Sequence, residues 1–68
     1  MEFEEFYLEW KANSKNKKKV LLKDDHGSLI ADEYKSVRDI VTNERWLILI
    51  LHGEISAEVP FDDIKEVK

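Results

Sequence analysis

Residues 46–59 read WLILILHGEISAEV, two apolar runs joined by a His-Gly pair, and they carry the clearest structural pattern in the chain. A two-residue hairpin loop needs positive φ at its central residues, which glycine adopts freely and histidine adopts more readily than most residues. The spacing therefore predicts a β-hairpin with His52 and Gly53 in the turn. Pro60 is expected to end the ladder, because it has no N–H to donate.

Counting outward from this turn predicts the register of the hairpin and the composition of its two faces. One face is wholly apolar and is expected to form the core, through the pairs Ile50 with Ile55, Ile48 with Ala57 and Trp46 with Val59. The other face places leucines opposite polar residues, in the pairs Leu51 with Glu54, Leu49 with Ser56 and Leu47 with Glu58.

The leucine stripe of this second face predicts an interaction surface. Burying three leucines contributes roughly 5–9 kcal/mol, at about 1.5–3 kcal/mol each, and a bare apolar strand promotes aggregation. Two alternatives remain for what covers this surface. One is another part of the same chain, either the N-terminal segment or residues 34–41, and the other is a second subunit. The second alternative predicts a homodimer with an interface formed by Trp46, Leu47, Leu49 and Leu51.

Two apolar runs, residues 20–22 and 29–31, flank a turn-forming segment and predict another hairpin. A four-residue loop over 24–27 would pair Leu22 with Leu29, and would set Lys19 opposite Asp32 and Lys18 opposite Glu33. Each pair of opposite charges across a β-ladder stabilises the hairpin by about a few tenths of a kcal/mol.

The remaining segments have weaker patterns. Residues 32–44 predict a strand that ends at a turn over 42–44, with a helix as the alternative. Residues 62–67 predict a turn followed by a closing strand or a helical turn. Residues 5–10 alternate in polarity and favour a strand, although Phe3, Phe6 and Trp10 also fit the spacing of a helical face.

Five or six short strands separated by turns predict an all-β or β-rich fold with a possible short helix, arranged as a small antiparallel barrel or meander. The chain of 68 residues is expected to form a single domain, 1–68. The closing segment 45–68, a strand, a glycine turn, a strand and then PFDDIKEV, resembles the end of Sm-like, SH3-like and bacterial PH-like domains in outline. That resemblance implies a type of fold and no particular function.

Charge is unevenly distributed along this chain, which has a net charge of −4. Residues 1–10 carry four glutamates and no base, while residues 11–23 carry six lysines and no acid. The basic stretch is either a solvated loop or a contact for nucleic acid or an acidic partner, through Lys15, Lys17, Lys18 and Lys19. The acidic residues allow a further alternative, a phage-type inhibitor or decoy that blocks a basic site on another protein.

Catalytic and cofactor motifs are scarce. The chain has no cysteine, only two glycines, and two histidines that each precede a glycine in a turn. We therefore predict a non-catalytic protein-interaction module with no cofactor, no metal and no small-molecule substrate. The longest apolar run has six residues and no basic, apolar leader is present, so a cytoplasmic location without a membrane partner is expected.

Overall fold

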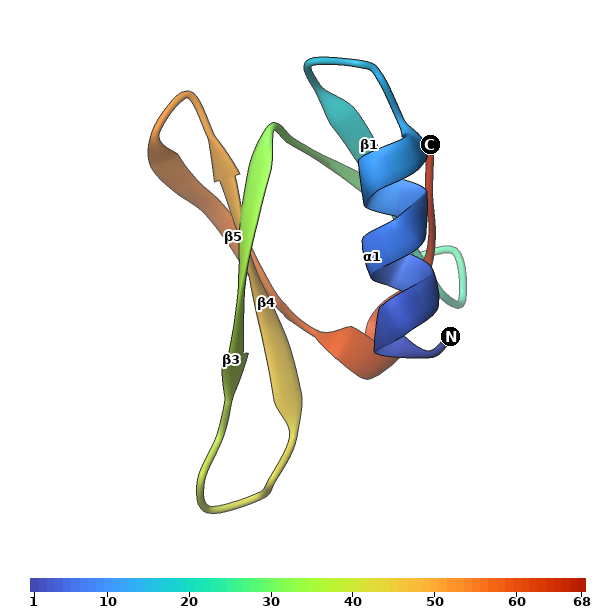
Figure 1. The fold of residues 1–68 in the computed structure, drawn as a ribbon. Coiled ribbons are helices and arrows are strands. Elements are labelled where there is room, and N and C mark those ends of the chain that lie inside the picture. Colours follow the sequence, from blue (N-terminus) through green and yellow to red (C-terminus); the bar gives the residue numbers. More distant parts are fainter.

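The computed structural model describes residues 1–68 as one α-helix and six strands (Figure 1). The elements in chain order are α1 Phe3–Ala12, β1 Lys18–Leu22, β2 Ser28–Ala31, β3 Glu33–Arg38, β4 Arg45–Leu51, β5 Glu54–Pro60, the 3-10 turn η1 Phe61–Asp63 and β6 Ile64–Val67. The strands form two antiparallel sheets, ordered β2-β1-β6 and β3-β4-β5. The predicted β-rich fold is confirmed, but no ladder joins the two sheets into a closed barrel.

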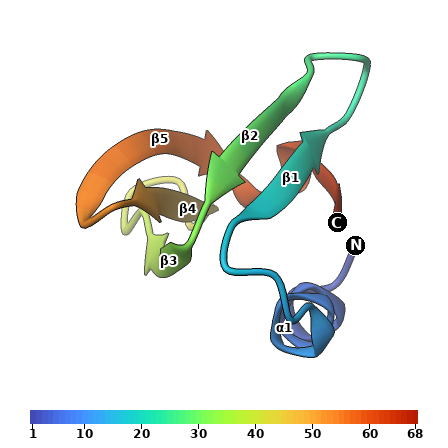
Figure 2. The same cartoon turned by 90° about the horizontal axis from the view of Figure 1, so that it is seen from above.

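Two short connections carry the chain from one sheet to the other. Asp32 alone separates β2 from β3, and its N–H donates to the Ile50 carbonyl at 2.9 Å. The turn η1 joins β5 to β6. Seen from above, β2 runs directly into β3 and β5 curves over towards β6, so the sheets share two corners (Figure 2).

The N-terminal segment is a helix, so the prediction of a strand over 5–10 is wrong. Helical spacing places Phe3, Phe6 and Trp10 on the side that faces the sheets, and Phe6 is fully buried. Leu8 belongs to the alternating strand pattern but is 55% exposed. Both periodicities fit these residues, and helix formers such as Glu, Lys and Ala together with burial of the aromatic side decide for the helix.

The core lies between α1 and the two sheets. Phe6 is at its centre and makes aromatic contacts with Tyr34 of β3, at 5.1 Å between ring centroids, and with Phe61 of η1, at 5.8 Å. The buried residues that surround it come from every part of the chain: Val20, Ala31, Leu47, Leu49, Phe61 and Ile64. Aromatic packing therefore attaches the helix to both sheets at once.

The first hairpin forms, but its register differs from the prediction by two residues. Val20 pairs with Leu29 and Lys19 with Ile30, so the predicted pairings of Lys19 with Asp32 and Lys18 with Glu33 are wrong. Asp24, Asp25 and Gly27 all have positive φ. This left-handed backbone places the turn one residue earlier than predicted, so that the Leu22 N–H bonds to the Gly27 carbonyl at 2.9 Å across residues 23–26.

Other local predictions hold with shifted ends. His52 and Gly53 have φ of 54° and 79°, as the two-residue turn requires. The strand in residues 32–44 forms, but it ends at Arg38 rather than at the turn over 42–44. Residues 62–67 form the end of a 3-10 turn and a closing strand, as predicted.

Candidate interaction surface

The two faces of β4 are both apolar and lie in different environments. Leu47 and Leu49 are fully buried in the core. Trp46, Ile48 and Ile50 alternate with them and therefore lie on the opposite side of the sheet, outside the core cluster. Trp46 and Ile48 are partly exposed, whereas Ile50, near the turn, is only 9% exposed. We call the side that carries these three residues the outer face. Figure 1 shows α1 on one side of the β3–β4–β5 sheet and no element of the chain on the other.

The predicted assignment of the two faces is therefore reversed. The register is as expected at the tip, where Ile50 pairs with Ile55, but Leu49 pairs with Ala57, which leaves Ser56 without a partner. This β-bulge shifts the rest of β5 by one residue, so that Ile48 lies opposite Glu58 and Leu47 opposite Val59. A one-residue shift exchanges the faces of a strand, which places Val59 against the core and Glu58 on the outer face.

Of the four residues predicted for the interface, only Trp46 lies on the outer face. Leu47 and Leu49 are fully buried within the chain. For these two leucines, the cover is therefore the same chain and not a second subunit. Leu51 is partly buried near the turn. Sequence reasoning assigned Ile48 and Ile50 to the core, because alternation separates two faces without identifying the one that α1 covers.

The outer face has three rows across the sheet, each with an apolar residue of β4 in the middle. The rows are Val37–Trp46–Pro60, Lys35–Ile48–Glu58 and Glu33–Ile50–Ile55. Val37, Trp46 and Glu58 also line a shallow hollow of about 360 Å³, together with Arg38 and Asp39. This face combines an apolar column with charged residues on both sides, as protein interfaces do.

The turn between β3 and β4 adds two exposed apolar side chains beside this face. Ile40 is 95% exposed and Val41 is 88% exposed. Asp39 Oδ1 accepts hydrogen bonds from the N–H groups of Val41 and Thr42, at 2.8 and 3.2 Å. The Arg38 guanidinium donates to the carbonyl and the side-chain oxygen of Asn43. These bonds constrain the backbone of the turn that carries the two exposed apolar side chains.

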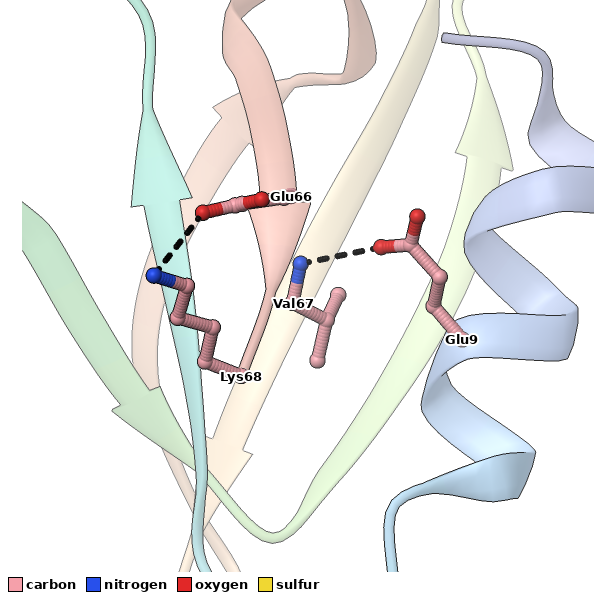
Figure 3. Close-up of polar contacts among 4 residues, drawn as sticks. All are labelled: Glu9, Glu66, Val67 and Lys68. Carbon is pink, nitrogen blue, oxygen red and sulfur yellow. Dashed lines mark hydrogen bonds and ion pairs between the residues drawn. The ribbon is translucent and has the colours of Figure 1, made fainter.

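Two of the four edge strands, β5 and β6, are protected against the addition of another strand. Edge strand β5 carries Glu54, Glu58 and Pro60, and charged residues and proline oppose edge-to-edge pairing. At the β6 edge, the Val67 N–H donates to Glu9 Oε1 of α1 at 3.1 Å, while Lys68 and Glu66 form an ion pair at 3.3 Å (Figure 3). The helix therefore occupies a backbone donor that an added strand would need.

The four lysines proposed for nucleic acid do not act as one group. Lys15 and Lys17 are exposed, but Lys18 donates to the Lys15 carbonyl and lies over the Trp10 ring, 5.1 Å from its centroid. Lys19 lies in β1 and lines a second hollow of about 360 Å³ together with Lys65 and Asp25. The structure thus pairs Lys19 with a lysine that the sequence places 46 residues away.

Trp10, the aromatic residue nearest these lysines, packs against residues of the core. The Trp10 ring packs edge-on against Tyr34, at 4.8 Å between centroids, and tilted against Phe6, at 5.8 Å. Burial raises the pKa of the Tyr34 phenol above its ordinary value, and the nearby Tyr7 phenol adds to the shift. A base stacking on Trp10 would have to displace the Lys18 ammonium or the core contacts.

Other classes of site have little support in the structure. No three His, Cys, Asp or Glu side chains are grouped so that they could hold a metal ion. Neither surface hollow is lined by a histidine, and the chain has no cysteine. Helix α1 has neither the length nor the apolar composition to cross a bilayer.

Comparisons with known proteins assign no family to this chain. No protein-family model matches it, and neither the curated proteins nor the solved structures include a significant match.

Proposed function

We propose that this protein is a non-catalytic protein-interaction module that forms a homodimer through the outer face of the β3–β4–β5 sheet. The observation that carries this proposal is the pair of partly exposed apolar residues Trp46 and Ile48, next to the exposed Val37, on the side of β4 away from α1. Such a face is expected to be covered by another molecule, because exposed apolar sheet surfaces associate in water.

The neighbouring residues support the same conclusion. Val37 is exposed next to Trp46, and the ordered turn presents Ile40 and Val41 beside it. An apolar centre with aromatic and aliphatic anchors and a charged rim is the composition of a specific interface rather than of a catalytic cleft. A homodimer needs no second gene product and can be tested with the purified chain alone.

The test is the molar mass of the purified protein in solution, measured by sedimentation velocity and light scattering over a range of concentrations. Wild type is expected to be dimeric, and Ile48→Lys is expected to be a folded monomer. Leu8→Lys is the matched control, since it places the same charge at an exposed apolar position of α1. A monomeric wild type at all concentrations, or a dimeric Ile48→Lys, contradicts the proposal.

Nucleic-acid binding is the second candidate function, and the observation in its favour is the hollow that contains both Lys19 and Lys65. Affinity for single-stranded RNA or DNA would fall steeply with salt concentration. Filter binding at low salt tests it, with a Lys17/Lys18/Lys19→Ala variant as the comparison. No retention of wild type at low salt removes this candidate. The acidic-decoy hypothesis has no comparable observation, since Glu9 is used within the fold.

A further inference from the structure

We infer that the two copies of the proposed homodimer are related by a twofold axis parallel to β4, so that Lys35 of each copy faces Glu58 of the partner subunit. This inference rests on the proposed function, because it describes the partner and the geometry of the same outer face. It is carried by the distribution of charge across the middle row of that face.

Lys35 and Glu58 flank Ile48 on opposite sides. The register pairs Lys35 of β3 with Ile48, and Ile48 in turn with Glu58 of β5. Both charged side chains are exposed, and neither takes part in the ion pair formed within the chain, which joins Lys68 to Glu66. The row therefore presents one free positive charge and one free negative charge, with an apolar residue between them.

A second copy can be stacked on this face by two kinds of in-plane twofold axis. Packed sheets lie about 10 Å apart with their strands roughly aligned, and a twofold interface uses the same patch on both copies. An axis parallel to β4 and passing by Ile48 places β3 of one copy over β5 of the other. Lys35 then faces Glu58 of the partner subunit on both sides of the axis, and Ile48 faces Ile48 of the partner subunit.

The alternative axis, perpendicular to the strands, gives the opposite pairing of charges. It places β3 over β3 and β5 over β5, so that Lys35 faces Lys35 of the partner subunit and Glu58 faces Glu58 of the partner subunit. Like charges brought together in a desolvated interface oppose association. The charge pattern of the row therefore selects the axis parallel to β4.

The neighbouring row and the apolar turn agree with this choice. The parallel axis preserves position along the strands, so Trp46 faces Trp46 of the partner subunit, and Val37 faces Pro60 of the partner subunit. It also brings both Ile40–Val41 turns to the same end of the dimer, where they can pack together. The perpendicular axis would place the two turns at opposite ends, each exposed to water.

Charge reversal tests this geometry. Lys35→Glu and Glu58→Lys each place like charges opposite each other in the parallel arrangement, and each is expected to weaken dimerisation at least about tenfold. The double variant Lys35→Glu/Glu58→Lys restores opposite charges and is expected to return the dimerisation constant to near that of wild type. Glu54→Lys, at the hairpin tip of the same strand, is the control and is expected to leave the constant unchanged.

Cross-linking supplies an independent readout, because the chain has no cysteine of its own. A single Thr42→Cys substitution in the β3–β4 turn, treated with a bis-maleimide that spans about the spacing of packed sheets, is expected to give covalent dimers. The control is Asn16→Cys, in the loop after α1, which is expected to remain monomeric on denaturing gels. Gly27 is not used for this purpose, because its positive φ disfavours a cysteine.

The outcomes separate failure of the axis from failure of the dimer. A monomeric wild type overturns both the proposed function and this inference. A wild-type dimer that Ile48→Lys dissociates, but that both single charge reversals leave intact, keeps the interface and overturns the parallel axis. Weakening by each single variant without recovery in the double variant also overturns it, as does the absence of a Thr42→Cys cross-link.

Discussion

The inner and outer faces of β4 differ little in sequence, yet Leu47 and Leu49 on the inner face are fully buried while Trp46 and Ile48 on the outer face are partly exposed. Leu47 and Leu49 are sealed by α1 and by residues of both sheets, whereas Trp46 and Ile48 have only their neighbours in the sheet around them. Both pairs of side chains are large and apolar, so hydrophobicity alone does not decide which pair is inside. What decides is the aromatic side of α1, which contacts Tyr34, the cross-strand neighbour of Leu49.

The difference also shows how a small chain distributes its apolar residues. A domain of this size has few elements with which to cover a sheet, and its single helix covers one side of β3–β4–β5. A strand that is apolar on both sides then leaves one face for a partner. The comparison of these two faces yields four predictions.

Insertion of one alanine after Ala57 should have the largest effect, because it shifts the rest of β5 by one residue against β4. Val59 would turn outward and Glu58 would turn towards the core, at a cost on the order of 5 kcal/mol. Expected stability for 68 residues is about 3–10 kcal/mol, so the insertion variant should be largely unfolded by circular dichroism. Deletion of Ser56 is the control and should stay folded, because it removes only the unpaired residue and keeps the pairs of β5 with β4; a folded, stable insertion variant would show that the register adjusts freely.

Leu49→Ala and Ile48→Ala form a matched pair, one residue apart on opposite faces. Leu49→Ala leaves a cavity in the core and should lower the free energy of unfolding by about 2–5 kcal/mol. Ile48→Ala should cost less than about 1 kcal/mol in the monomer, since its side chain is partly solvated there. Urea unfolding at concentrations below the dimerisation constant measures both, and equal losses would contradict the assignment of faces.

Arg45→Gln tests how far the inner face extends along β4. The Arg45 guanidinium lies 4.1 Å from the centroid of the Phe3 ring and donates to the Ser36 hydroxyl. Loss of this cation–π contact should lower the free energy of unfolding by about 0.5–1 kcal/mol. Ile40→Ser, in the exposed turn, is the control and should lower the free energy of unfolding of the monomer by less than Arg45→Gln does. A larger loss for Ile40→Ser than for Arg45→Gln would contradict the conclusion that the covered face of β4 extends to Arg45.

Tyr34→Phe should have the smallest effect, confined to alkaline pH. The pKa of Tyr34 is raised above 10.0 in the folded chain by burial and by Tyr7, so the unfolded chain loses this proton first. The stability linked to this group is complete below pH about 10 and is lost as pH rises through the folded pKa. Between pH about 9 and 11, the free energy of unfolding from urea titrations should therefore decrease less for Tyr34→Phe than for wild type. An equal decrease in both proteins would show that ionisation of Tyr34 is not linked to stability.

Local patterns predicted much of the fold. The His52–Gly53 turn, the end of the ladder at Pro60 and the closing segment after η1 follow from turn chemistry that involves a few adjacent residues. The helix was missed because residues 3–10 fit both periodicities. The interaction surface was placed on the right strand but on the wrong face, since Ser56 carries no signal that marks it as the bulged residue.

Two features can be read from the sequence alone: the 46–51 segment is apolar on both sides, and a chain of 68 residues has few other elements to cover it. Its alternation, its turn residues and its length are properties of neighbouring residues, and they act before any long-range contact forms. Which side is covered depends on long-range contacts. Aromatic contacts between residues far apart in the chain, Phe6 with Tyr34 and Phe61, set where α1 packs. The bulge at Ser56 sets which side chains of β5 lie on the covered face.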